Sequence, residues 1–302
     1  MVSPNDGYGL RLPPPWITPA AGKNNREVQP VLIVRRRRLL YPSYVQDYLD
    51  RVTAADVAAG NTSGLELGVT DGANTFIEDL VNDGLLGVSG GVISQAASVM
   101  KASVPMAGAR TRLGAMTPLV GAGPTSFNFV DGDYNRKTGL VGDGSTRYLN
   151  SNRNNNADPQ DSNHNAAWLS QGATVGGGVI GTDTSSVIGS NNIFYDIGGN
   201  GLFFRNRALS LTSFAGAIPC PTGFIGHSRS AAASFLARAN LSTITVTQTS
   251  GIPYNGNIFV FRRGTEETNA RLAFYSIGES LDLAILDARV TALINAYAAA
   301  IP

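Results

Sequence analysis

The chain has 302 residues, of which 43% are hydrophobic and only 15% are charged. This length can bury a sizeable core, and the apolar content excludes a wholly disordered chain. The net charge of +1 gives no overall field that would attract nucleic acid or an anionic membrane, so neither is expected as a direct partner. No uninterrupted apolar run is long enough to span a membrane. The single cysteine, Cys220, excludes an intrachain disulfide.

Residues 1–40 are expected to form an extended arm for assembly. Six prolines lie within the first thirty residues, and proline interrupts helices and lacks the amide donor that a sheet needs. Because such an arm has no evident core of its own, we expect it to be ordered by a neighbouring subunit. The β-prone run 31–34 precedes four candidate assembly residues. These are Arg35, Arg36, Arg37 and Arg38. A solvated charge run and nucleic-acid contact are the alternative interpretations of these arginines.

Residues 41–104 show helical periodicity and are expected to form a small helical module. Ser43 and Gln46 have the spacing of a capping box, and apolar residues follow at intervals of four and three. Thr70 is expected to cap a second helix, which ends at Gly84. A third, weaker helix is expected over residues 92–101.

Residues 105–302 are expected to form a β-sandwich that carries a C-terminal helix. From Pro105 onward the apolar period falls to two, and turn clusters such as Asn255-Gly256 separate short runs. This spacing predicts a mainly β fold, a two-sheet antiparallel jelly roll. An apolar stripe predicts a helix over Leu283–Ala299. The expected strands are 166–169, 193–197, 202–207, 224–227, 234–238, 243–247, 258–262 and 271–277.

The residues that most catalytic sites require are scarce. The only histidines are His164 and His227, and the second lies in an expected strand, which favours a buried structural role. Cys220 lies between two prolines and is interpreted as a small buried residue. Glu266 and Glu267 are adjacent, so on a strand they point to opposite faces and do not form a glycosidase carboxylate pair. We therefore expect no enzyme, no catalytic residues, no cofactor and no metal.

Two motifs resemble ligand-binding loops but are incomplete. The run 176–181 matches GxGxxG, yet a turn follows it where a dinucleotide site needs a helix. Asp131, Asp133 and Asn135 resemble the opening of a calcium loop, but Arg136 stands where such a loop needs glycine. We therefore assign no dinucleotide site to the first and interpret the second as a solvated turn.

Six short segments form a distinctive set in the second part of the chain. They are Ala107–Thr111, 118–121, Asp133–Leu140, 142–145, Asn152–Gln160 and Phe274–Asp282. Together these segments resemble a group of tailed-bacteriophage virion proteins with a concanavalin A or laminin-G-like jelly roll. The resemblance covers roughly Pro105–Pro302. It supplies no established functional residues.

The resemblance implies a structural protein on the virion surface that is assembled in the host cytoplasm. The leading hypothesis is a non-enzymatic tail fibre or baseplate adhesin that contacts the host surface. A capsid decoration protein and a glycan depolymerase are the alternatives, and the missing carboxylate pair disfavours the second. The implied partners are other virion proteins, copies of the same chain, with a trimer favoured, and a host surface glycan.

The candidate receptor surface is the polar segment Asn150–Asn165. Loops displayed by a rigid sheet often carry binding residues, and amides and carboxylates can bind sugar hydroxyls. Within this segment Asn154, Asn155 and Asp158 are the candidate receptor residues. Because asparagine tolerates left-handed backbone conformations, the alternative is that the run only shapes an ordered loop.

Overall fold

The computed structural model describes residues 41–182, 187–198, 201–214 and 219–302. The expected arm, with its run of arginines from Arg35 to Arg38, lies outside the described residues. Residues 41–302 form one unit.

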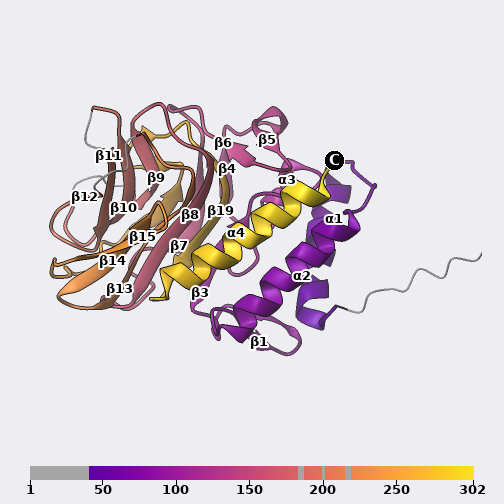
Figure 1. Cartoon of the computed structure of the whole chain (residues 1–302), viewed down its shortest axis with the longest axis horizontal. Helices are drawn as coiled ribbons and strands as arrows, with labels where there is room; N and C mark the ends of the chain where they lie inside the picture. The colour runs from indigo at the N-terminus through magenta and orange to yellow at the C-terminus, as the bar shows by residue number, and fades with distance from the viewer. Residues whose placement is uncertain (1–40, 183–186, 199–200, 215–218) are drawn as a thin grey trace, which may run out of the picture. The chain divides into compact units, whose positions relative to one another are not determined.

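Two antiparallel sheets pack face to face, as the alternating pattern predicts (Figure 1). All eight expected strands are present. The first sheet, which we call the helix-side sheet, contains in spatial order β15 (Ser242–Val246), β14 (Ser234–Ala239), β13 (Gly223–Ala231), β8 (Asn163–Gln171), β19 (Arg271–Gly278), β6 (Gly139–Val141) and β5 (Tyr134–Asn135), with β3 (Met100–Pro105) also paired to β19.

The second sheet, which we call the open sheet, lies on the other side of the core. Its strands are, in spatial order, β12 (Thr212–Phe214), β11 (Gly201–Asn206), β10 (Asn191–Asp196), β9 (Gly177–Thr182), β16 (Asn257–Val260), β7 (Tyr148–Asn154) and β4 (Thr125–Phe127). A short hairpin, β17 (Arg262–Arg263) and β18 (Glu266–Glu267), joins this sheet at β9.

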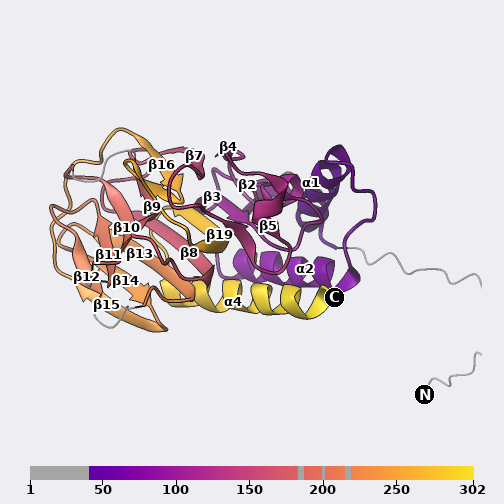
Figure 2. The ribbon, with the colours of Figure 1, turned by 90° about the horizontal axis from the view of Figure 1, so that it is seen from above.

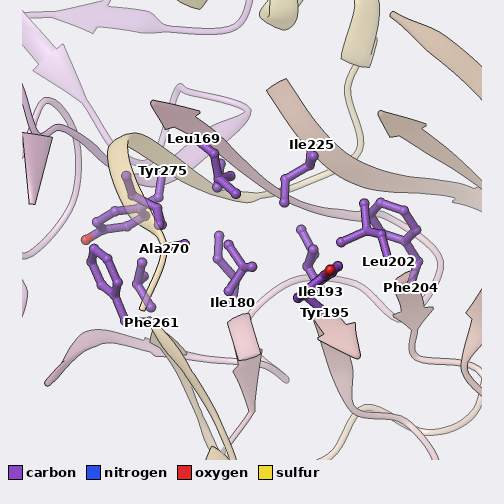
Figure 3. Packing of buried hydrophobic residues seen from close by; sticks show 14 of the residues in the cluster. Leu169, Ile180, Ile193, Tyr195, Leu202, Phe204, Ile225, Phe261, Ala270 and Tyr275 are labelled. Carbon is purple, nitrogen blue, oxygen red and sulfur yellow. The ribbon is translucent and has the colours of Figure 1, made fainter. Parts of the chain in front are cut away.

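The core between the sheets is built from alternate residues of each strand. Figure 3 shows side chains from both sheets meeting there, among them Leu169, Ile180, Ile193 and Ile225. Each of these four is fully buried. Burying one such side chain stabilises the fold by roughly 1.5–3 kcal/mol. The hydrophobic effect on alternating strands therefore accounts for the sandwich.

Three helices form a layer on the outer face of the helix-side sheet. They are α1 (Ser43–Ala58), α2 (Leu67–Asn82) and α4 (Leu283–Ala300). Figure 2 shows α4 running along the strands of this sheet, with α2 beside it. The expected C-terminal helix is thus confirmed, and its stripe Leu286, Val290 and Leu293 is buried.

Helices α2 and α4 pack closely because small residues line their contact. A Cβ added at Gly68 would lie 2.7 Å from the Cβ of Ala300. Arg289 of α4 forms ion pairs with Asp79 of α2 (2.9 Å) and with Asp83, which directly follows α2 (2.8 Å). Among the described residues, α4 is the one helix long and apolar enough to cross a membrane by length and composition, and here its apolar side packs against protein.

Three expectations for the helical region are wrong. Helix α1 begins without a side-chain cap, because the Ser43 hydroxyl donates to a turn carbonyl instead. Thr70 lies inside α2, and its hydroxyl donates to the carbonyl of Leu67. The third helix is absent from residues 92–101, where β2 (Val92–Ser94) pairs with β1 (Gly87–Ser89) and β3 then enters the helix-side sheet. Strand pairing overrides the weak helical pattern of this stretch.

Candidate functional site

The expected receptor segment lies at one end of the sandwich, where several strands meet their loops. Asn155 follows the last residue of β7, and its side chain is fully buried. Its amide donates to the carbonyls of Gly189 (2.9 Å) and Tyr254 (3.0 Å). We call this region the loop end and define it as residues 154–162, 187–190, 207–210 and 248–256.

The other two expected receptor residues also bond within the chain. Asp158 is buried and forms an ion pair with Arg153. Asn154 is half-buried, and its amide donates to the side chain of Asn255 at 2.8 Å. The three residues therefore help to hold the loop end together. Receptor contact through them stays a prediction.

Arg207 is a fully buried residue of the loop end and joins its loops. Its guanidinium donates to the carbonyls of Asn155 and Pro159. Its backbone amide donates to the carbonyl of Ser190 (3.0 Å), and its own carbonyl accepts from Gly251 (2.6 Å). Burial lowers its pKa to about 10, so the side chain stays charged at neutral pH. Hydrogen bonds to a charged group are among the stronger ones, so these loops are fixed from inside.

Arg229 plays the same part next to Arg207 and is also fully buried. It lies in β13, and its guanidinium stacks over the ring of Phe235 at 5.3 Å. Its donors reach backbone carbonyls at 2.8–3.1 Å, those of Asn206, Ala231, Ala232, Ser234 and Gln248. The base of the loop end is therefore a polar network within an otherwise apolar sandwich.

Both histidines are buried and serve the scaffold. The Nδ1 of His227 lies 2.8 Å from the amide of Asn206, and burial lowers the His227 pKa to about 3. The Nε2 of His164 lies 2.8 Å from the Ser276 hydroxyl, and burial lowers the His164 pKa to about 4. Both rings are thus neutral near pH 7. Burial also raises the pKa of the Cys220 thiol to about 11, so it is not a reactive thiolate.

The loop end exposes large aliphatic side chains. Ile252 is 82% exposed and Leu209 is 64% exposed, with Ile188 exposed as well. The loops that carry Ile188 and Ile252 adjoin each other: a Cβ added at Gly251 would lie 2.5 Å from the Cγ2 of Ile188. Residues 208 and 250 also form an isolated β-bridge. Neighbouring exposed aliphatic residues on a protein surface are typical of an interaction site.

The glycine run at 176–181 has a packing role. Strand β9 contains most of it, and the hairpin β17–β18 lies against that strand. A Cβ at Gly178 would collide with the backbone of Arg262 and Arg263. Glu266 is exposed and pairs with Arg263 (2.6 Å), whereas the buried Glu267 lies 3.5 Å from Arg262. The two carboxylates therefore occupy different environments, as their adjacency predicts.

The calcium-like turn forms a short 3-10 helix, η1 (Asp131–Asp133), near α3 (Arg112–Ala115). Asp131 pairs with Arg112 at 3.0 Å, and Asp133 pairs with Arg147 at 2.9 Å. Each carboxylate is thus neutralised by an arginine. Within the described ranges, no three His, Cys, Asp or Glu side chains gather where they could hold a metal ion.

Two of the segments that resemble phage proteins meet at the contact between the helices and the sandwich. Arg136 forms a two-pronged ion pair with Glu66, at 2.9 and 2.5 Å, and Arg110 reaches the same carboxylate at 2.8 Å. The buried Asp56 of α1 accepts from the amide (2.8 Å) and hydroxyl (2.7 Å) of Thr111. The arginines hold the pKa of Glu66 below its usual range. We call these five residues the joint.

No family model and no curated protein matches the chain. Among solved structures, the chain is similar to a sialidase from Trypanosoma rangeli, with a TM-score of 0.43 and 8% identity. The match covers 74% of this chain and 39% of the sialidase, so the chain spans well under half the length of that protein.

Two further similar structures are also from carbohydrate-active proteins. One is domain 4 of a GH43 extracellular arabinanase from Geobacillus stearothermophilus in complex with arabinotriose, with a TM-score of 0.32, 13% identity and coverage of 58% of this chain and 82% of that domain. The other is an arabinofuranosidase complexed with arabinofuranosyl-alpha-1,2-xylobiose, with a TM-score of 0.34, 12% identity and coverage of 71% and 46%. None of the three is described as a phage protein.

The expectation that the chain is not an enzyme requires correction. The similar structures are all glycosidases or glycosidase domains, which contradicts that expectation. At 8% to 13% identity the likeness is one of fold alone, so it assigns neither a reaction nor catalytic residues to this chain.

Proposed function

We propose that this chain is a component of a tailed-bacteriophage virion and contacts the host surface through its loop end. The positions of the phage-like segments support this proposal. Arg110 and Arg136 from two of these segments build the joint, and Asn152–Gln160 builds part of the loop end. We call the face formed by α1, α2 and α4 the helical side. The residues that carry the resemblance therefore lie both beside the helical side and at the loop end of one unit.

The observation that carries the proposal is the inverted chemistry of the loop end. Charged and amide side chains such as Arg207 and Asn155 are buried there, while Ile188, Leu209 and Ile252 face outward. Globular proteins ordinarily bury aliphatic residues and expose charged ones. Buried hydrogen bonds already hold these loops in place. The binding of a partner to the aliphatic residues would therefore cost little free energy for ordering the loops.

Within the virion we propose a place in the tail fibre or baseplate. The helical side would bind other virion proteins. The joint would keep the loop end in a constant orientation relative to the helical side. We further propose that copies of the chain assemble with one another, as a trimer in a fibre. A capsid decoration protein is the alternative, since the same unit could bind capsid subunits through its loop end.

Competition for host adsorption tests the proposal. Excess purified full-length protein should reduce adsorption of the phage, because it occupies the same surface sites. The variant Ile252→Asp places a charge at the most exposed aliphatic position of the loop end, and we expect it to compete at least about tenfold less well, equivalent to 1.4 kcal/mol of binding free energy. Folding should be unaffected because the side chain is exposed.

The matched control is Leu67→Asp at the start of α2. Leu67 is 63% exposed, comparable to the loop-end residues, but it lies on the helical side. It should compete as the wild type does. Equal competition by both variants would contradict a role for the loop end, and no competition by the wild type would contradict host contact.

A further inference from the structure

A second surface feature lies at the opposite end of β13 and β14 from the loop end. The tip of the β14–β15 hairpin, Asn240 and Leu241, faces α4 across a groove of about 240 Å³. This is below the roughly 300 Å³ at which pockets for drug-sized ligands begin, so the groove suits a single small ring. Its other walls come from the start of β13 and from Trp168 of β8.

The lining combines one large aromatic surface with several hydrogen-bonding groups. Trp168 is half-buried, and its indole N–H donates weakly to the Thr291 hydroxyl at 3.3 Å. Asn240 at the hairpin tip and Thr222 just before β13 are exposed residues of the lining. Asp287 at the base is held by Arg238 at 2.8 Å. A ring with an apolar face and polar edges is the ligand class that such a lining fits.

Leu241 gives the groove a feature that the fold itself does not require. It is 80% exposed, and its φ of 61° lies in the left-handed region that a branched aliphatic residue rarely adopts. Turns of this kind ordinarily carry glycine or asparagine at such positions. An exposed aliphatic residue in this conformation gains neither burial nor a relaxed backbone from the fold, which makes it a candidate ligand contact.

We propose that this groove binds a single pyranose ring of a carbohydrate. The C–H face of the sugar would lie against Trp168 and Leu241, and the ring hydroxyls would bond to Asn240 and Thr222. The Thr291 hydroxyl already donates to Asp287 at 3.1 Å, so a ring hydroxyl could only donate to its oxygen. An aromatic face attracts the partly positive C–H groups of a sugar, and amide and hydroxyl groups can both donate to and accept from its hydroxyls. The site belongs to the isolated chain, so it does not depend on the virion assignment or on the loop end.

Fluorescence of Trp168 tests this site directly. The chain contains two tryptophans, so the background variant Trp16→Phe leaves Trp168 as the only indole emitter. The probes are the methyl glycosides of glucose, galactose and N-acetylglucosamine. We expect at least one of them to change the emission saturably, with a Kd on the order of 1 mM for so small a contact.

The variant Leu241→Gly separates a binding role from a structural one. It removes the aliphatic contact and suits the left-handed turn, so we expect Kd to rise by roughly tenfold while the melting temperature stays equal or increases. The control Ile252→Gly removes an equally exposed residue from the loop end and should leave Kd unchanged.

Three results would overturn the proposal. They are no saturable change with any glycoside, unchanged binding by Leu241→Gly, and a response to N-acetyl-leucinamide without a response to any sugar. The last result would indicate a pocket for a peptide side chain. Adsorption of particles plays no part in this titration, so its outcome is separate from that of the competition experiment.

Discussion

Two arginines and two histidines lie fully inside this molecule, where ionisable groups are uncommon. Arg207 and Arg229 remain charged because backbone carbonyls surround their guanidinium groups. His164 and His227 remain neutral because burial lowers both pKa values. The strand pattern identifies His227 as a buried residue. It does not identify Asn155, whose partners Gly189 and Tyr254 lie 34 and 99 residues away in the sequence.

The buried histidines predict that stability falls in mildly acidic solution. The unfolded chain takes up protons near pH 6.5, whereas the folded pKa values are about 4 for His164 and about 3 for His227. The contribution of the two neutral histidines to the free energy of unfolding is therefore complete above pH 6.5. It decreases as the pH falls from 6.5 toward the folded pKa values. Denaturant unfolding should show a loss of roughly 2 kcal/mol for each histidine between pH 7 and pH 5.

The variants His164→Gln and His227→Gln serve as controls for this pH dependence. Each should remove about half of the change between pH 7 and pH 5, because one titrating group is left. The carboxylates with lowered pKa, such as Glu66, titrate mainly below this window. An unfolding free energy that is constant over the window would show that the rings are not held neutral.

At the scale of elements, alternation identifies eight strands but misses those with unusual chemistry. Strand β7 has the sequence YLNSNRN, which contains too few apolar residues to show alternation. Its outward side chains are partly exposed, and its inward Ser151 donates to the carbonyl of Ile258. Strand β9 contains adjacent glycines, because β17–β18 packs where side chains would otherwise lie. The loops that join the strands depend on buried arginines, and no local pattern in the sequence predicts that dependence.

The variant Arg207→Met tests how the loops of the loop end are held. It removes the charged donors while keeping much of the apolar stem, which leaves the carbonyls of Asn155 and Pro159 without their partner. We expect unfolding in denaturant to show a loss of about 3 kcal/mol, because buried unpaired acceptors are costly. Hydrogen exchange should also become faster in residues 155–162.

Arg112→Met is the matched control for that variant. Arg112 pairs with the exposed Asp131, and surface pairs of this kind contribute about 0–1 kcal/mol. A loss for Arg207→Met no larger than for Arg112→Met would mean that the apolar core alone holds the loop end.

At the scale of the whole molecule, the joint makes the helices and the sandwich one body. Glu66 binds two arginines from the sandwich side, and α4 packs against both the helix-side sheet and α2. Such a body offers two distant regions for contact, the helical side and the loop end. The fold class could be predicted from the sequence because it follows from periodicity. The joint could not, because it needs ion pairs between residues far apart in the chain.

The most direct test of the virion assignment is immunogold electron microscopy of phage particles with an antibody raised against the full chain. We expect gold at the tail fibre or baseplate of intact particles. Gold distributed over the capsid would contradict the tail location and favour the decoration alternative. Particles that carry no label, although the same antibody detects the protein in infected cells, would contradict the assignment of the chain to the virion.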